Sequence, residues 1–280
     1  MRVAYLVVAH HLPGQLARLV AHLRRAGDVY IHLDRKARDR FHGLEGCHVL
    51  SERLDVWWGG WSIVAAELAL ARAALPGCYD YYSHLTGQCY PIKPLAAFHA
   101  FLEANHPAEH MVYADVATQW PAAVGRFDKH YLERRTLVNR AVNRILRRVP
   151  YRRKVPAGLI PKSGWQNWTL THGALEYLTR AFRDRPELAG YFRLGMNACE
   201  TALQTVFAGS PFQAQVNPRS THEIEFPPGS PHPRIWTQTD LPRLLASPAF
   251  FARKFDVSVG GDPLNELDTI LASTMRSQKN

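Results

Sequence analysis

The sequence predicts an α/β fold with a Rossmann-like amino-terminal half and a mixed central sheet. First, residues 3–8 form an apolar run rich in β-branched side chains, as in a buried parallel strand. Second, a helical pattern and another short strand follow within about thirty residues, the span of one βαβ unit. Third, strand-like and helix-like segments keep alternating through the amino-terminal half. With 280 residues, 46% of them hydrophobic, the chain can bury one large core.

The first elements follow from local patterns. Pro13 and Gly14 open a helix whose apolar residues recur on one face, at Leu16, Leu19, Val20 and Leu23. Gly27 interrupts this pattern. The next two strands are predicted at residues 29–34 and, shorter, at residues 48–50.

A second helix is expected after a segment that contains Trp57, Trp58 and Trp61. Ser62 is its predicted N-cap, and an apolar stripe continues to Leu75. We expect the three tryptophans to be core residues. Further along, the pattern predicts a buried strand and then another helix, at residues 81–85 and 95–104.

Residues 129–154 carry a large excess of arginine and lysine. Leu137, Ala141 and Ile145 recur at helical spacing, so we predict a basic amphipathic helix over residues 134–149 that ends at Pro150. Three interpretations are open: a solvated charged face, a surface that docks on anionic membranes, or a nucleic-acid site. Aromatic residues are not interleaved with these cations, so membrane docking is preferred and no nucleic-acid partner is expected.

Composition limits the compartment and the partner. The net charge of +10 indicates an acidic partner, such as a nucleotide phosphate, an anionic lipid or an acidic glycan. The four cysteines have no C-x-x-C spacing, and the first apolar run is too short for a signal peptide or a membrane span. We therefore predict a cytoplasmic protein that can attach peripherally to the inner face of the membrane.

Glu200, Arg234 and Lys254 form the main catalytic hypothesis. Glu200 stands at a predicted helix start, where a carboxylate is also favoured simply by the helix dipole. The two cations could equally be ordinary surface residues. Together, however, a carboxylate base and two fixed cations are the parts needed to transfer a sugar from a nucleotide-sugar. An Asp-x-Asp triplet is absent from the sequence, so no metal is expected.

Polar residues at the ends of the first two predicted strands suggest a nucleotide site, because open α/β sheets bind ligands there. Asp34 could accept a hydrogen bond from a ribose hydroxyl or from uracil, or it could cap the turn that follows the strand. The other donor-site candidates are Ala9, His10 and His32, and His11 could line the same slot.

Three motifs in combination resemble one family. Residues 57–62, 80–93 and 251–256 are similar to segments of the core-2/I-branching β-1,6-N-acetylglucosaminyltransferases, a family that also contains the peptide O-xylosyltransferases and many bacterial members. The resemblance extends over about residues 3–256. It implies a fold of GT-A type, a UDP-sugar donor, inversion at the anomeric carbon and no required metal or other cofactor.

The resemblance also implies roles for individual residues. Glu200 would be the catalytic base, and Arg234 and Lys254 would bind the donor diphosphate. A segment at the sugar and acceptor pocket corresponds to Ser163, Gly164, Trp165, Gln166 and Trp168, and the two tryptophans are the candidates for stacking on a sugar. Trp165 stands where a serine is usual in the family.

The resemblance therefore predicts an enzyme that transfers N-acetylglucosamine or xylose to a glycan, a glycolipid or another hydroxyl acceptor. We expect a single domain, residues 1–280, with a nucleotide-binding half at 1–110 and an acceptor and catalytic half at 111–280. The alternative is a basic protein that binds nucleic acid or an anionic surface without catalysis.

Overall fold

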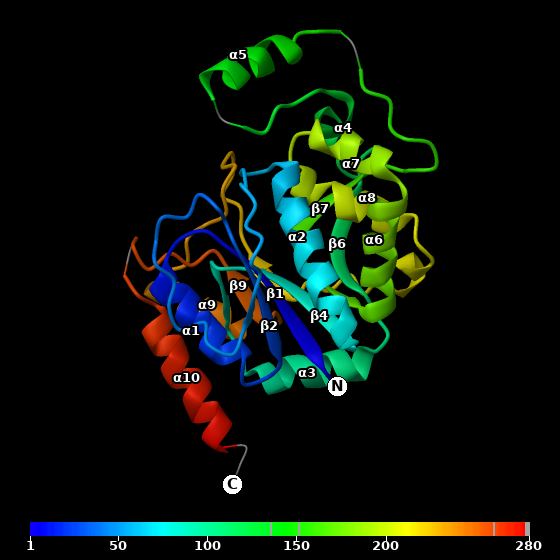
Figure 1. The fold of residues 1–280 in the computed structure, drawn as a ribbon. Coiled ribbons are helices and arrows are strands. Elements are labelled where there is room, and N and C mark those ends of the chain that lie inside the picture. Colours follow the sequence, from blue (N-terminus) through cyan, green and yellow to red (C-terminus); the bar gives the residue numbers. More distant parts are fainter. Residues whose placement is uncertain (135, 151, 260, 278–280) are drawn as a thin grey trace.

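A six-stranded mixed sheet runs through the middle of the computed structural model, which describes residues 1–134, 136–150, 152–259 and 261–277 (Figure 1). Its strand order is β3-β2-β1-β4-β7-β6. A second sheet has the order β5-β9-β8. The strands are β1 (Val3–Ala9), β2 (Asp28–Leu33), β3 (His48–Val49), β4 (Tyr81–Thr86), β5 (Cys89–Pro91), β6 (His110–Asp115), β7 (Lys162–Thr171), β8 (His222–Ile224) and β9 (Phe251–Arg253).

The large sheet is parallel on one side and antiparallel on the other. β1 pairs in parallel with β2 and β4, and β2 pairs in parallel with β3. β7 runs antiparallel to both β4 and β6. The mixed sheet, and with it the predicted α/β fold with a Rossmann-like amino-terminal part, is therefore confirmed. Strands from both predicted halves of the chain share this sheet.

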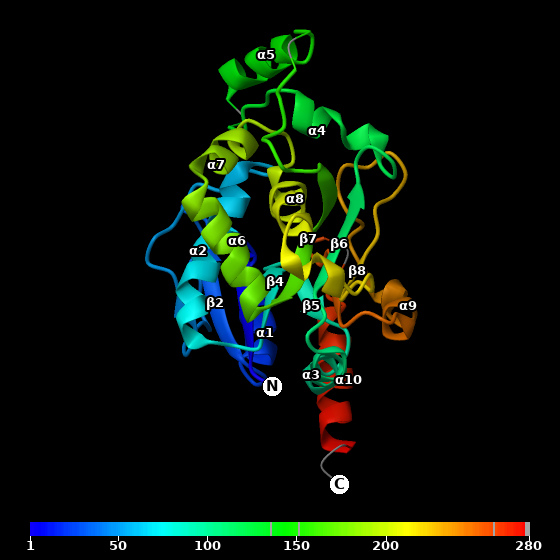
Figure 2. The ribbon, with the colours of Figure 1, turned by 90° about the vertical axis from the view of Figure 1, so that its right-hand side faces the viewer.

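Helices cover both faces of the sheet (Figures 1 and 2). The α-helices are α1 (Pro13–Leu23), α2 (Trp61–Ala74), α3 (Leu95–Asn105), α4 (Gly125–Asp128), α5 (Leu137–Leu146), α6 (His172–Asp184), α7 (Pro186–Arg193), α8 (Ala202–Ala208), α9 (Leu241–Ala246) and α10 (Leu264–Ser277). Short 3-10 helices are η1 (Leu75–Gly77), η2 (Pro121–Ala123), η3 (Ala198–Glu200), η4 (Pro211–Gln215) and η5 (Gln238–Asp240).

Alternation along β1 divides the core into two layers. Ala4, Leu6 and Val8 pack with side chains of α2, α6, α7 and α8. The intervening residues, from Val3 to Ala9, pack instead with α1, α3, α9 and α10. Every residue of β1 is buried, which explains why the strand is a continuous apolar run without polar alternation.

The small sheet joins distant parts of the chain. β9 pairs antiparallel with β5 and parallel with β8. This pairing brings the segment that contains Arg253 and Lys254 beside the loop that follows β4. The carboxyl ends of the parallel strands and the β9 segment therefore face the same region of the molecule.

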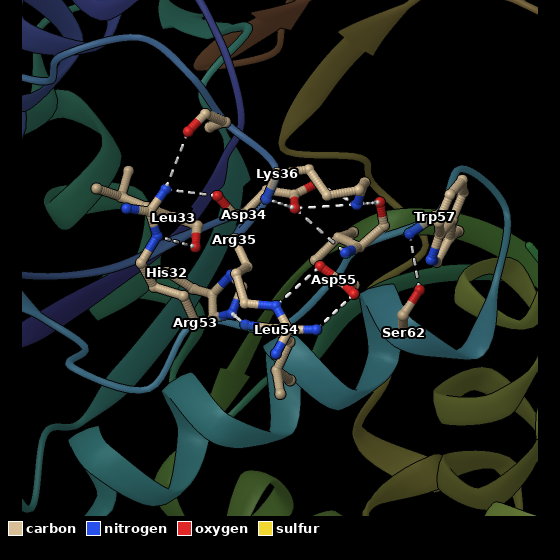
Figure 3. Close-up of polar contacts among 12 residues, drawn as sticks. His32, Leu33, Asp34, Arg35, Lys36, Arg53, Leu54, Asp55, Trp57 and Ser62 are labelled. Atoms are coloured by element: carbon tan, nitrogen blue, oxygen red, sulfur yellow. Dashed lines mark hydrogen bonds and ion pairs between the residues drawn. The ribbon is translucent and has the colours of Figure 1, made fainter.

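Two helix boundaries differ from the sequence-based prediction. Helix α2 begins at Trp61, and its N-cap is Gly60 rather than Ser62. The Ser62 hydroxyl instead accepts a hydrogen bond from the amide of Trp57 at 2.8 Å, which holds the preceding turn (Figure 3). This contact depends on the loop before the helix, so the capping pattern alone placed the helix start two residues too late.

The basic helix is shorter than the predicted residues 134–149. Helix α5 spans Leu137–Leu146, because the Thr136 hydroxyl caps its first turn by accepting from the amide of Asn139. Arg134 precedes the helix, and Arg135 lies outside the described residues. Helix α5 lies at one end of the molecule, opposite the end that carries α10 (Figures 1 and 2). Within the described part of the chain, no helix has the length and apolarity needed to cross a bilayer.

Candidate active site

A cleft of about 300 Å³ opens where the chain leaves β1, β2 and β4 at their carboxyl ends. It is lined by residues from both halves of the chain. Among them are several residues that the sequence singled out: Ala9, His10, Asp34, Gln166 and Glu200. Open α/β sheets bind ligands at this edge. This cleft is therefore the candidate active site.

The backbone around Glu200 is held by the tryptophan-rich segment. Glu200 ends η3, immediately before α8, as the predicted helix start requires. The carbonyl of Gly59 accepts a hydrogen bond from the amide of Ala198 at 2.9 Å. Gly59 has a φ of +70°, and a Cβ atom there would lie 2.8 Å from Oδ1 of Asn197. Only glycine satisfies both demands, so this motif positions the Glu200 turn.

The Glu200 side chain is oriented by an arginine from another part of the chain. Nη1 of Arg126 lies 2.6 Å from one oxygen of Glu200 and donates also to the hydroxyl of Ser163 at 2.7 Å. The Arg126 guanidinium lies over the ring of Trp120, 4.6 Å from its centroid. The carboxylate is thus fixed at the cleft with one oxygen occupied. Ser163, predicted for the sugar pocket, contributes by holding Arg126.

Asp34 lies at the cleft but is already paired. Its carboxylate accepts from Nζ of Lys36 at 2.9 and 3.0 Å and from the backbone amide of Lys36 at 2.8 Å (Figure 3). Nζ of Lys36 also donates to the carbonyl of Val56 at 2.6 Å. Asp34 therefore caps its own turn, as the alternative interpretation of the sequence expected, while lining the cleft. Lys36 lines the cleft with it.

His32 does not belong to the cleft, which corrects the prediction that it binds the donor. Its side chain is buried, and Nε2 accepts a hydrogen bond from the amide of Leu54 at 3.0 Å (Figure 3). Burial lowers the pKa of His32, so the imidazole is an uncharged structural acceptor. His32 and Asp34 are two apart, so strand alternation alone would place them on the same face. They differ because β2 ends at Leu33 and the chain turns before Asp34.

His10 and His11 meet at the end of β1. Their ring centroids are 3.9 Å apart, and both residues line the cleft. Desolvation, together with the charge of His11, lowers the pKa of His10 to about 4. Desolvation also lowers the pKa of His11, and the nearby Lys254 adds to the effect. The cleft therefore presents two neutral imidazoles at neutral pH.

The two predicted diphosphate-binding cations are brought together by backbone pairing. The amide of Lys254 donates to the carbonyl of Arg234 at 3.3 Å, and the amide of Trp236 donates to the carbonyl of Lys254 at 2.9 Å. The Arg234 guanidinium contacts Asp240 and lies 3.9 Å from Glu225. The chain neighbours of these cations, Pro233 and Arg253, line the cleft. Arg234 and Lys254 therefore flank the cleft but are not among the residues that line it.

Beneath the cleft lies a buried polar cluster. Nε2 of Gln166 donates to the Glu67 carboxyl at 3.0 Å, and Nε2 of His84 lies 3.6 Å from the same oxygen. Burial raises the pKa of Glu67 to about 8 and lowers the pKa of His84 to about 3. At neutral pH the contact therefore joins two uncharged groups rather than an ion pair. Because its amide nitrogen is used on Glu67, the amide oxygen of Gln166 is left for the cleft.

Replacing Glu67 by Gln is expected to change how stability depends on pH. In the unfolded chain Glu67 ionises near pH 4.5, whereas in the folded protein it keeps its proton up to about pH 8. The folded state thus binds more protons in this window, and the free energy of unfolding falls as pH rises. Glutamine does not titrate, so Glu67→Gln should gain stability relative to wild type between these values, by at most about 5 kcal/mol.

Urea unfolding of both proteins across this pH range measures the effect. The matched control is Glu103→Gln, which replaces an exposed carboxyl on α3. Parallel stability curves for wild type and Glu67→Gln would show that Glu67 is ionised in the folded protein.

Comparison with known proteins identifies the family of this chain. The sequence model of the Core-2/I-Branching enzyme family matches residues 3–233. The chain belongs to this family. The family predicted from the sequence, and with it the enzyme class of glycosyltransferase, is thereby confirmed.

Curated relatives of this Core-2/I-Branching enzyme include xylosyltransferase 2 of mouse and of human. Each is 24% identical to the chain over 96% of its length, and the match covers 33% of each relative. The chain thus spans about a third of the relatives it matches. Among solved structures, A197 from STIV matches with a TM-score of 0.29 and 12% identity, over 63% of this chain and 68% of that one. A mannose-1-phosphate geranyltransferase from Thermus thermophilus matches with a TM-score of 0.33 and 15% identity, over 75% and 68%.

Two assignments of tryptophans in this Core-2/I-Branching enzyme were wrong. Trp168 is 1% exposed and stacks on His84 within the core, so it cannot pack against a sugar. Trp58, expected in the core, is 46% exposed and lines the cleft near His232. Trp58 lies in the turn that precedes α2, whereas Trp168 lies in a central strand whose two faces are both covered.

Two other residues of the predicted sugar pocket, Gly164 and Trp165, have structural contacts in β7. A Cβ atom on Gly164 would lie 2.0 Å from the carbonyl of Val112, so this glycine permits β7 and β6 to approach. Trp165 is half-buried and does not line the cleft, and its carbonyl accepts from the side-chain amide of Gln204 at 2.8 Å. Of this segment, Gln166 alone lines the cleft.

Sequence reasoning missed several functional candidates of the Core-2/I-Branching enzyme. Arg126 gave no local signal, because its partner Glu200 is 74 residues away. Arg253 stands beside Lys254, and Lys36 stands two residues after Asp34, so cations near a predicted residue were the available signal. Arg253 lines the cleft and donates to the hydroxyl of Thr86 at 3.3 Å. The described residues contain no group of three or more side chains of metal-binding type.

Proposed function

We propose that the protein transfers a sugar from a UDP-sugar to a hydroxyl acceptor by direct inverting displacement, with Glu200 as the general base. The observation that carries the proposal is the fixed Glu200 carboxylate in a cleft that also holds Asp34 and the paired histidines. A basic segment, which contains Arg253 and Lys254 and pairs through its backbone with Arg234, flanks the same cleft. A base and a nucleoside-sized slot in one cleft, with cations at its edge, are what the reaction requires.

The donor would lie across the carboxyl ends of β1 and β2. The neutral rings of His10 and His11 can pack against the base, and Asp34 can accept from ribose or uracil. Lys254 and Arg234 would hold the diphosphate, with Arg253 beside them. Arg234 is shared with Asp240 and Glu225, so Lys254 carries the larger part of this role.

In the proposed reaction the acceptor oxygen bonds to C1 of the sugar while its proton passes to the Glu200 carboxylate. The bond between C1 and the β-phosphate oxygen breaks, and UDP leaves with the electron pair. Arg126 orients the Glu200 carboxylate through its hydrogen bond to one of the two oxygens. Attack opposite the leaving group inverts the anomeric centre.

N-acetylglucosamine and xylose are the proposed sugars, and a glycan or glycolipid is the proposed acceptor. The family supports both sugars, and the relatives named xylosyltransferase 2 support xylose. Trp58 and Phe226, both exposed at the cleft, offer aromatic surfaces for sugar binding. Calorimetric titration of the purified protein with UDP-N-acetylglucosamine, UDP-xylose, UDP-glucose and UDP-galactose tests this proposal. We expect one of the first two donors to bind most tightly.

Transfer is expected to survive EDTA. The cations of the basic segment would neutralise the leaving diphosphate, the role that Mg²⁺ or Mn²⁺ has in metal-dependent enzymes. The measurement is UDP release with the best donor of the panel, with and without EDTA, after passage over a chelating resin. An absolute requirement for Mn²⁺ would overturn the proposed role of the cations and direct attention to the acidic pairs Glu223/Glu225 and Glu266/Asp268.

A further inference from the structure

Helix α5 turns apolar side chains outward. Leu137, Val138 and Ile145 are 81%, 70% and 63% exposed. The residue of this helix that is buried is Asn143, whose side-chain amide and carbonyl pair with the backbone of Leu132 at 2.9 and 2.8 Å. The helix is therefore attached through a polar side chain and displays its apolar ones. This arrangement is the reverse of a helix that packs on a core.

Cations occupy the rest of the outward face. Arg140, Arg144, Arg147 and Arg148 are exposed, and no ion pair joins them to an acidic side chain among the residues that the structure describes. A hollow of about 370 Å³ beside the helix is lined by Tyr131, Arg134, Arg140, Asn143, Arg144 and Arg147. Clustered like charges repel one another, so such a surface is stabilised by bound anions.

The apolar side chains and the arginines lie side by side along α5. At about 100° per residue, Leu137, Ala141 and Ile145 fall in one stripe, and Val138 widens it. Arg144 falls on the edge of this stripe, and Arg140 and Arg147 lie further round on the same side. The same spacing, continued past the end of the helix, places Arg148 within the stripe. A helix in the interface of a bilayer needs this combination: apolar side chains to insert and arginines to meet lipid phosphates.

We propose that α5, with the arginine-lined hollow beside it, docks the protein on a membrane that contains anionic lipids. A solvated face explains the arginines but not the three exposed aliphatic side chains. A nucleic-acid site also explains the charge, but it would favour aromatic residues for stacking over aliphatic ones. The exposed aliphatic side chains and the arginines together fit a lipid surface.

The docking surface is tied to the rim of the cleft. Glu133, which precedes α5 in the chain, accepts from the amide and the hydroxyl of Ser62 at 2.9 and 3.0 Å. Ser62 lies in the first turn of α2, next to the segment that carries Trp58 and Gly59. Docking would hold the cleft near the bilayer, where a membrane-borne acceptor is found. This last point rests on the proposed function, whereas the docking itself does not.

The test is sedimentation of the full chain with vesicles of phosphatidylcholine alone or of phosphatidylcholine mixed with phosphatidylglycerol. We expect binding to the mixed vesicles at low salt and its loss at high salt. Arg140→Gln with Arg144→Gln should weaken binding roughly 25-fold, because each cation near an anionic surface contributes roughly a factor of five. Leu137→Ser with Ile145→Ser, which keeps every charge, should weaken it as well.

Arg72→Gln with Arg180→Gln is the matched control, since it removes the same charge from exposed positions on α2 and α6. This control should bind vesicles like wild type. Equal binding to both kinds of vesicle, or to neither, would overturn the proposal. So would binding that the serine variant retains in full, or tighter binding to single-stranded DNA than to mixed vesicles. UDP titration of each variant reports separately on the proposed transferase function.

Discussion

Glu200→Gln is expected to lose sugar transfer while retaining UDP binding. General base catalysis contributes roughly 10²–10⁴-fold, and glutamine cannot accept the proton of the acceptor hydroxyl. Glutamine has nearly the same shape, and its carbonyl oxygen can still accept from Arg126, so the loop should keep its conformation. The initial rate with the preferred donor measures the loss, and calorimetry with UDP shows whether the cleft is intact.

Glu176→Gln is the matched control, because it replaces an exposed carboxyl on α6. It should transfer sugar like wild type. If Glu200→Gln also retained nearly normal turnover, another group would have to take the proton, and Glu200 would be a structural partner of Arg126 instead.

The second large effect is expected at the basic segment, where the backbones of Lys254 and Arg234 pair. Lys254→Ala should weaken UDP binding roughly 10–100-fold, since a hydrogen bond to a charged group contributes about 1.5–3 kcal/mol. Arg234→Ala should have a smaller effect, because Asp240 and Glu225 already share its charge. Calorimetry with UDP and with uridine separates the two parts of the ligand. Uridine lacks the diphosphate, so its affinity should not change.

Arg243→Ala is the control for this segment. Like Arg234, Arg243 pairs with Glu225 and lies near the ring of Trp236, at 5.2 Å, but no donor role is proposed for it. An equal loss of UDP affinity in Arg243→Ala, or an equal loss of uridine affinity in Lys254→Ala, would mean that the substitutions disturb the fold of the segment rather than a phosphate contact.

The order of strands and helices was predictable because its signals are local. The apolar run of β1 and the periodicity of α1 need no knowledge of distant residues. The helix start at Glu200 could likewise be predicted from consecutive residues. The Trp57–Ser62 motif could be recognised but not explained. Its physical reason, the approach of Gly59 to Asn197 and Ala198, joins two segments far apart in the chain.

Local sequence patterns could not predict which residues surround each candidate site residue in the folded protein. His32 and Asp34 looked equivalent at the end of one strand, and both are largely buried, yet only Asp34 lines the cleft. Trp168 and Trp58 exchanged their expected environments for the same reason. Burial depends on which elements cover a strand or a turn, and the sequence of that strand or turn does not contain this information.

The sequence by itself determined the α/β layering and the family, and it singled out one carboxylate and two cations as candidates for the site. The tertiary structure alone decided that Arg126 holds Glu200, that Lys36 pairs with Asp34, and that α5 faces outward with its apolar side chains. Short-range periodicity encodes secondary structure, because it reflects contacts within one turn or one strand pair. Electrostatic partners and exposed faces arise from contacts between segments many residues apart, and only the folded chain brings these segments together.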